Sequence, residues 1–231
     1  MHHEITHGPS FAMLRVDLSP GETFVAEAGS MVARSTNVEM DVKMGAGKKA
    51  GFFGTFKAIL IAFIRKLVGG ESFFVNHFHS PAPGSVWVAP TLSGSIEHRQ
   101  MTGQKLVLSS GAYVASVGDI DVKMKFGGLT SILSKEGAFM LECTGQGDLW
   151  FNSYGGIETI DLTNGSYIVD NGHLVGFEGD LSWKIASAGG GMMGAFASGE
   201  GLVMEFSGTG RIYIQSRNLG AFADYVSGLL T

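Results

Sequence analysis

Cysteine, charge and long apolar runs are all scarce in this chain of 231 residues. The single cysteine, Cys143, excludes an internal disulfide framework and any metal site built from several thiolates. Charged residues make up only 16% of the chain, and the net charge is −5. This acidic balance excludes a nucleic-acid-binding protein recognisable by bulk charge, so we expect no nucleic-acid partner. Because 45% of the residues are hydrophobic, the composition also excludes intrinsic disorder.

Segments that would direct the chain to or across a membrane are also missing. The longest unbroken apolar run covers Ala58 to Ile64, whereas a helix that crosses a bilayer needs roughly 20 apolar residues. The opening residues, MHHEITHGPSF, lack the apolar core and cleavage site of a secretory signal. We therefore expect a cytoplasmic protein, and peripheral association with a membrane surface stays open.

Glycine is abundant, at 35 residues, and it marks an internal repeat. Residues 102–124 align without gaps with residues 163–185 at an offset of 61 positions, and residues 20–33 align with residues 102–115 at an offset of 82. The identical pairs at the offset of 61 are Thr102/Thr163, Gly111/Gly172, Val114/Val175, Gly118/Gly179, Asp119/Asp180 and Lys123/Lys184. Such self-similarity predicts one structural unit used several times.

The second half of each repeat recurs as well. Three glycines become equivalent, and an aromatic residue follows each of them three positions later: Gly84 and Trp87, Gly147 and Trp150, Gly210 and Tyr213. The sequence therefore predicts a single compact domain over residues 1–231. It consists of three repeats, at approximately 11–101, 102–162 and 163–218, and of a C-terminal helix at 219–231.

Alternating side chains predict that each repeat is made of β-strands. Apolar residues alternate with charged ones over residues 38–44 and again over residues 120–126. Alternation with a period of two places all the apolar side chains on one face of a sheet. We therefore predict an all-β fold of three β-sandwich-like units around a pseudo-threefold axis. One inserted amphipathic helix and a short C-terminal helix complete it.

Gly-rich apolar connections interrupt the repeats at residues 45–70, 126–137 and 189–199. In the first connection, apolar residues recur at three- and four-residue steps over residues 52–68, which predicts an amphipathic helix. In a threefold arrangement the connections should emerge on one side, and apolar loops gathered on one face mark an interaction surface. The predicted interaction surface comprises Phe52, Phe53, Phe56, Lys57, Phe63, Arg65, Lys66, Leu129, Ile132, Met192, Met193 and Phe196.

The first connection is also basic. Residues 42–70 carry six of the sixteen basic residues of the chain and no acidic residue. A basic amphipathic helix can lie in a membrane interface with its cations at anionic headgroups. It can instead pack across its own β core or against a neighbouring subunit, which is the commoner arrangement. The sequence favours packing and keeps the membrane interface as the alternative.

No residue pattern in the sequence predicts catalysis. The segment GAGKKAG at residues 45–51 resembles a phosphate-binding loop, but Val42 and Lys49 stand where that motif needs glycine and a hydroxyl residue. The nucleophile-elbow, zinc-protease and dinucleotide-binding patterns are absent from the sequence. We therefore expect neither an enzyme nor a cofactor, and Cys143 is interpreted as a small buried hydrophobic residue.

Histidine supplies the metal hypothesis. His77 and His79 are two positions apart on a predicted strand, so they share one face, and His98 could supply a third ligand. A solvent-exposed pair of histidines is the alternative, and it is the one we favour. We therefore predict no metal site, and these three residues are its only candidates.

Several longer motifs resemble one known family. They are E-I-x-x-G-P-S at residues 4–10, AEAGSMV at 26–32, GGESFF at 69–74, NSYGGIE at 152–158, VDNGHLVGF at 169–177 and SGTGRIYIQSRN at 207–218. Together they resemble the altered inheritance of mitochondria protein 24 family, over nearly the whole chain. The resemblance implies the β fold of the tryptophan RNA-binding attenuator protein-like superfamily, with three units about a pseudo-threefold axis. It brings no catalytic residues, and its mitochondrial members are associated with the inner membrane.

These observations lead to two hypotheses for the function. The first is a non-enzymatic scaffold or interaction protein, a homo-oligomer or a protein that docks to a partner or membrane surface through the apolar connections. The second is a small-ligand or metal-binding module with a pocket between the repeats. An enzyme is the third and least favoured class.

Overall fold

The computed structural model describes residues 1–44, 74–126, 139–188 and 202–230. Strands dominate this part of the chain, so the all-β prediction is confirmed. The predicted helix at 52–68 and all twelve residues of the predicted interaction surface lie outside the described residues. They remain predictions.

Fourteen strands and one α-helix form the described part of the fold. Strands of the N-terminal half are β1 (His2–Thr6), β2 (Met13–Leu18), β3 (Thr23–Glu27), β4 (Met31–Arg34), β5 (Glu39–Met44), β6 (Phe74–His79) and β7 (Gly84–Val88). Strands of the C-terminal half are β8 (Ile96–Thr102), β9 (Leu106–Ser109), β10 (Tyr113–Phe126), β11 (Phe139–Asn152), β12 (Ile157–Asp170), β13 (Leu174–Ser187) and β14 (Leu202–Gln215). A 3-10 turn, η1 (Asn171–His173), and the helix α4 (Leu219–Leu229) complete the set.

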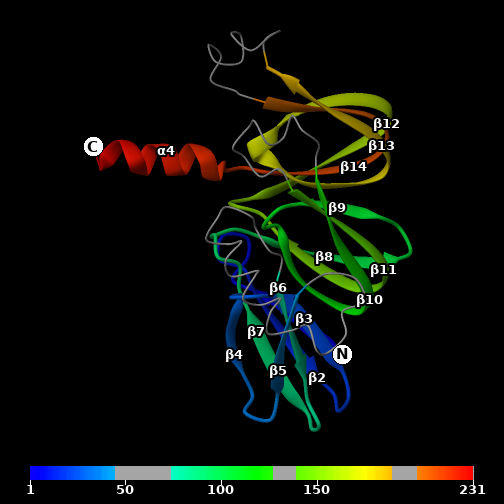
Figure 1. Ribbon diagram of the computed structural model, residues 1–231, viewed down its shortest axis with the longest axis vertical. Helices are drawn as coiled ribbons and strands as arrows, with labels where there is room; N and C mark the ends of the chain where they lie inside the picture. The colour runs from blue at the N-terminus through cyan, green and yellow to red at the C-terminus, as the bar shows by residue number, and fades with distance from the viewer. Residues whose placement is uncertain (45–73, 127–138, 189–201, 231) are drawn as a thin grey trace.

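The strands form two sheets. A four-stranded sheet has the order β1-β2-β7-β4, and a ten-stranded sheet runs β12-β14-β13-β9-β11-β10-β3-β6-β5, with β8 also paired to β11. Every pair of strands in these ladders is antiparallel. The strands follow one another along the long axis of the molecule (Figure 1), from β2–β7 at one end through β8–β11 to β12–β14 at the other. We call these three sets the first, second and third strand groups.

Segments that the sequence aligns make equivalent ladders. β2 and β3 pair with β7 and β6, β8 and β9 both pair with β11, and β12 pairs along its length with β14. The irregularity between Met31 and Ala33 in β4 recurs in β10 and in β13, at the offsets of 82 and 61. The three repeats and their pseudo-threefold axis stay predictions.

Glycines allow the long strands of the second and third groups to bend. Gly118 faces Gly147 in the β10·β11 ladder, and Gly179 faces Gly210 in the β13·β14 ladder. Gly118 and Gly179 have φ of 92° and 99°, which L side chains rarely adopt. The backbones also approach closely, because a Cβ atom on Gly147 would lie 2.0 Å from the carbonyl oxygen of Val117. Each glycine pair therefore sets the curvature of its hairpin.

Two short ladders join the strand groups. β3 pairs with β10 at the first junction, where Val25 faces Ser116, and β9 pairs with β13 at the second junction, where Val107 faces Phe177. Three clusters of buried side chains follow the same order along the molecule, with Trp150, Tyr113 and Phe206 among their largest members. The first cluster joins Trp150 of the second group to side chains of the first, and the second cluster includes Tyr213 of the third group, so the core continues across both junctions.

The predicted C-terminal helix is present as α4. The Asn218 side chain caps it by accepting a hydrogen bond from the backbone N–H of Ala221, at 3.1 Å. The helix stands away from the strands (Figure 1), and none of its residues is buried. Among the described residues, no helix is long and apolar enough to cross a bilayer.

Candidate functional site

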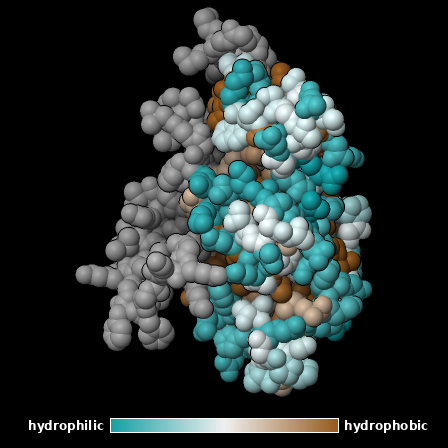
Figure 2. Space-filling view, turned by 90° about the vertical axis from the view of Figure 1, so that its right-hand side faces the viewer, coloured by the Kyte–Doolittle hydropathy of each residue, from teal (hydrophilic) through white to brown (hydrophobic). Residues whose placement is uncertain are grey.

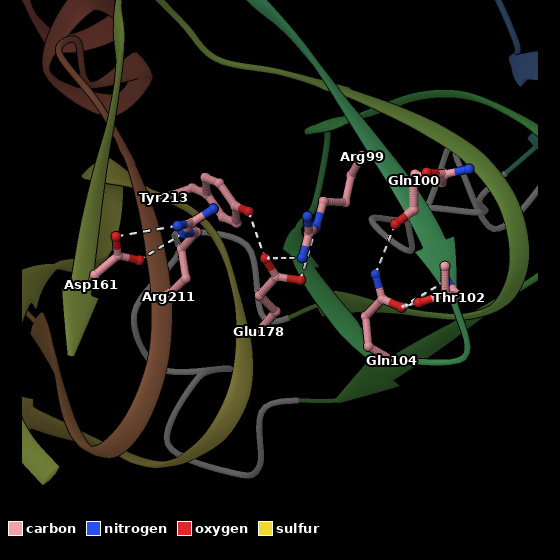
Figure 3. Close-up of polar contacts among 8 residues, drawn as sticks. All are labelled: Arg99, Gln100, Thr102, Gln104, Asp161, Glu178, Arg211 and Tyr213. Carbon is pink, nitrogen blue, oxygen red and sulfur yellow. Dashed lines mark hydrogen bonds and ion pairs between the residues drawn. The ribbon is translucent and has the colours of Figure 1, made fainter. Parts of the chain in front are cut away.

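A buried polar network crosses the second junction, and Glu178 on β13 lies at its centre. The Glu178 side chain is only 8% exposed. Arg99 on β8 donates from Nε to Oε2 at 3.1 Å, and its second guanidinium nitrogen lies 3.0 Å from Oε1. The hydroxyl of Tyr213 on β14 donates to the same Oε1 at 2.8 Å (Figure 3). A buried carboxylate is stable when both oxygens are paired in this way.

Burial and its partner fix the state of the tyrosine. Burial, and then the hydrogen bond to Glu178, raises the pKa of Tyr213 to about 12. The hydroxyl is therefore a stable donor at neutral pH. Since both carboxylate oxygens of Glu178 are engaged, the network is suited to holding two strand groups together and not to transferring protons.

A cavity of about 250 Å³ lies beside this network. Side chains from β9, β10, β11 and β13 line it, so it lies at the junction between the second and third strand groups. Its apolar wall consists of Val107, Met140, Phe177, Leu181 and Trp183. A concave site with an apolar wall and a few charged groups is the usual form of a small-molecule site.

Among the described residues, the charged lining of the cavity leaves one cation without a partner. Lys125 lies 3.8 Å from Glu142, and Glu178 is held by Arg99. Lys105 also lines the cavity, and no carboxylate among the described residues pairs with it. An anionic group at the cavity would therefore meet a free ammonium group.

A second cluster, of imidazole and indole rings, joins β1 to β8 and β11 of the second strand group. His98 on β8 stacks on Trp150 with ring centroids 5.2 Å apart, and its Nε2 lies 2.8 Å from Oδ1 of Asp148. His3 on β1 lies 4.6 Å from the His98 ring. Burial, and then the neighbouring His98, lowers the pKa of His3. The cluster therefore favours a neutral His3.

The metal hypothesis finds no further support in this geometry. His79 lies 3.1 Å from Oε2 of Glu39 and His77 faces Asp41 in the β5·β6 ladder, while His98 belongs to the ring cluster. Across the four described ranges, no three His, Cys, Asp or Glu side chains form a group that could hold a metal ion. Cys143 is buried in β11, and burial raises the pKa of its thiol to about 12.

The sequence analysis did not identify the polar network. Its members are 79 and 35 positions apart, so no local motif joins them. One signal was present, because the offset of 61 places Glu178 where the second repeat has Val117. A charged residue at a position that is apolar in a related repeat could have indicated a buried partner.

The fold and these clusters define the class: an all-β protein in which successive strand groups share short ladders and bury polar contacts between them. The family model described as Mitochondrial biogenesis AIM24 matches residues 3–217, so the chain belongs to this family, and the predicted resemblance is confirmed. An uncharacterised protein of Streptococcus pyogenes serotype M6, M6_Spy0233, is 32% identical over 230 residues, which cover 96% of this chain and 88% of the relative.

A solved structure extends this likeness to three dimensions. The crystal structure of the protein SPYM3_0169 from Streptococcus pyogenes matches with a TM-score of 0.80 at 29% sequence identity. The match covers 99% of both chains. The all-β architecture is therefore shared along the whole length of the two proteins.

Proposed function

We propose that the protein is a non-enzymatic scaffold that self-associates through exposed apolar side chains. The helix α4 carries this proposal, because it projects from the strands (Figure 1) and buries none of its residues. The opposite side of the molecule, shown in Figure 2, is mostly hydrophilic with small apolar patches. Exposed apolar surface that gathers in one element marks an interaction site.

The side chains of α4 favour a protein surface as the occupant. Leu219, Phe222, Val226 and Leu229 are exposed by 48%, 46%, 36% and 68%, and their spacing places them on one face of the helix. This is the pattern of a helix that lies in an apolar groove. The helix contains no Lys or Arg, whereas binding to anionic lipid depends on such cations.

Two charge variants of α4 test the proposal. Phe222→Asp/Leu229→Asp places two carboxylates in the apolar stripe, and the control Ala221→Asp/Ser227→Asp adds the same charge outside it. By sedimentation velocity, we expect the wild type to exceed the mass of the 24.4 kDa chain. The stripe variant should lose association at least about tenfold, and the control should retain it.

Vesicles of neutral phosphatidylcholine and of phosphatidylcholine with phosphatidylserine complete the test. If the wild type keeps the mass of one chain and sediments with vesicles, lipid is the occupant of the α4 stripe. That result would contradict a protein partner. A wild type that stays at 24.4 kDa and sediments with neither vesicle would contradict the scaffold function.

The cavity supports a second candidate function, the binding of a small amphipathic carboxylate. Trp183, Phe177 and Leu181 offer an apolar wall, and Lys105 offers a cation without a partner among the described residues. An aliphatic or aromatic monocarboxylate matches both features, because its chain can contact the wall while its carboxylate meets the ammonium group.

Three eight-carbon probes distinguish this candidate from non-specific apolar binding. Octanoate, octanol and octylamine share one chain and differ in charge, and isothermal titration calorimetry measures the binding of each. We expect octanoate to bind best and Lys105→Ala to weaken it about tenfold, a loss typical of a charged hydrogen bond. The control Lys123→Ala, which removes an exposed cation paired with Asp121, should bind octanoate as the wild type does. Equal binding of all three probes would contradict the candidate.

A further inference from the structure

We propose that copies of this chain join head to tail, with β12 of one copy pairing antiparallel to β4 of the next and Ile168 opposite Arg34. The partner is a second copy of the chain, so the proposal rests on the scaffold function and adds an interface that does not involve α4. Its basis is the register of the two junctions inside the chain.

The two internal junctions have the same register in the repeat numbering. At the first junction Val25 on β3 faces Ser116 on β10, and at the second Val107 on β9 faces Phe177 on β13. At the offset of 82, Val25 aligns with Val107, and at the offset of 61, Ser116 aligns with Phe177. The neighbouring pairs of each ladder agree in the same way. The ladder between the first and second groups and the ladder between the second and third groups therefore have the same register.

The same register predicts a third junction, between β12 and β4. At the offset of 61, the positions that align with Leu106, Val107 and Leu108 are Tyr167, Ile168 and Val169 on β12. At the offset of 82, the positions that align with Ala115, Ser116 and Val117 are Ala33, Arg34 and Ser35, at β4 and directly after it. The predicted pairs are Tyr167 with Ser35, Ile168 with Arg34, and Val169 with Ala33. β4 also carries the irregularity found at the start of β10 and β13, so its backbone has the form that accepts such a partner.

In the part of the chain that the structure describes, both strands lack a partner strand on the required side. Within the described ranges, β12 forms a ladder only with β14, and β4 forms one only with β7. Tyr167 is 46% exposed, while its equivalent Leu106 is fully buried, and Ile168 is 61% exposed, while its equivalent Val107 is half-buried. On the other edge Val32 is 56% exposed, while its equivalent Val114 is buried. Among the described residues, Tyr167, Ile168 and Val32 are thus more exposed than the equivalent positions at the internal junctions.

The part of β12 in the predicted junction lacks the usual protection against pairing. Native edge strands avoid association by means of Pro, bulges or charged side chains such as Lys. Residues 166–169 contain no Pro and no charged residue, and the irregularity of β12 lies outside them, between Leu162 and Gly165. β12 and β4 belong to the strand groups at opposite ends of the long axis (Figure 1), so one chain does not pair its own two edges. A second copy supplies the missing strand to each end.

Mixed cysteine variants test the register directly. Facing residues of an antiparallel ladder have Cα atoms about 4.5 to 5.5 Å apart, which a disulfide can bridge. We expect an equimolar mixture of Ile168→Cys and Arg34→Cys copies to form a disulfide-linked dimer under mild oxidation, and neither variant alone to do so in comparable yield. In the control mixture, Glu158→Cys replaces Ile168→Cys, and Glu158 lies on β12 outside the predicted junction. No dimer, or equal dimer in both mixtures, overturns the proposal.

Charge variants give an independent readout in the native assembly. Ile168→Lys sets a cation opposite Arg34 and Ile168→Glu sets an anion there, so both remove the same exposed side chain with opposite electrostatic effect. We expect association of the Lys variant to be about tenfold weaker than that of the Glu variant, and Ile168→Lys/Arg34→Glu to regain it. Equal dissociation constants for the two variants overturn the register. If the wild type associates and only the α4 stripe variant dissociates, the scaffold function stands and this interface fails.

Discussion

Glu178 shows at the scale of one residue how the junction between two strand groups is held. Its carboxylate meets Arg99 from the second group and Tyr213 from its own group. We expect Arg99→Ala to lower the free energy of unfolding by about 2 kcal/mol, because it removes a charged hydrogen bond and leaves a buried carboxylate short of partners. Urea denaturation followed by circular dichroism measures the change.

A matched surface pair supplies the control for this prediction. Arg211 donates to Asp161 at 2.7 and 3.2 Å, and both side chains reach solvent. Arg211→Ala should change the free energy of unfolding by less than about 1 kcal/mol, because exposed ion pairs contribute little. The double variant Arg99→Met/Glu178→Leu should recover most of the stability. Equal losses for Arg99→Ala and Arg211→Ala would show that the junction network does not stabilise the fold.

At the scale of an element, the bent hairpin of β10 and β11 depends on Gly147. Its φ is 146°, and an added Cβ would lie 2.0 Å from the Val117 carbonyl oxygen. We expect Gly147→Ala to destabilise the protein by about 1 to 3 kcal/mol through backbone strain. In Gly156→Ala, the new Cβ would lie 3.7 Å from Oγ of Ser216, an ordinary contact. Thermal unfolding of the two variants should therefore differ, and similar melting temperatures would refute the bend.

The N-terminal strand β1 should loosen in acid. Folding lowers the pKa of His3, first through burial and then through His98, so the folded state favours the neutral imidazole. The stability of this strand is therefore complete above the ordinary histidine pKa of 6.5, and it falls as the pH drops below that value. Asp148 opposes the shift, while His2 and the terminal amine add to it. Hydrogen exchange of β1 amides, relative to that of β2, should rise from pH 7 to pH 5.

The control for the acid effect is His3→Gln, which keeps a polar side chain and cannot be protonated. Exchange of its β1 amides relative to β2 should show little dependence on pH in the same range. If the variant and the wild type loosen in parallel, a group other than His3 controls the strand.

At the scale of the whole molecule, the sequence predicted what depends on local periodicity. The alternation predicted strands at residues 38–44 and 120–126, which are β5 and the end of β10, and the helix predicted at 219–231 is α4. Family membership was also predictable, because its motifs extend along the chain. These features need only neighbouring residues, so a single sequence contains them.

The candidate sites could not be predicted in the same way, because they depend on contacts between distant strands. Arg99 and Glu178 meet only when the second and third groups pair through β9 and β13. The cavity beside them takes its wall from four different strands. The internal offsets of the sequence relate equivalent positions but do not state which strands pair. The ladders of the structure, combined with the same offsets, predict the register in which β12 pairs with β4 of a second copy.

Head-to-tail pairing gives each copy one β12 edge and one β4 edge, so growth continues until the assembly closes into a ring or is blocked. A copy with Ile168→Lys retains its β4 edge and should act as a terminator. When this variant is added to the wild type at one part in five, the weight-average mass measured by sedimentation velocity should fall. A copy that also carries Val32→Asp, Phe222→Asp and Leu229→Asp has both edges and the α4 stripe blocked, so it should stay monomeric and leave the mass of the wild-type assembly unchanged. If both variants lower the mass equally, or neither does, the copies do not grow by adding β12 to β4.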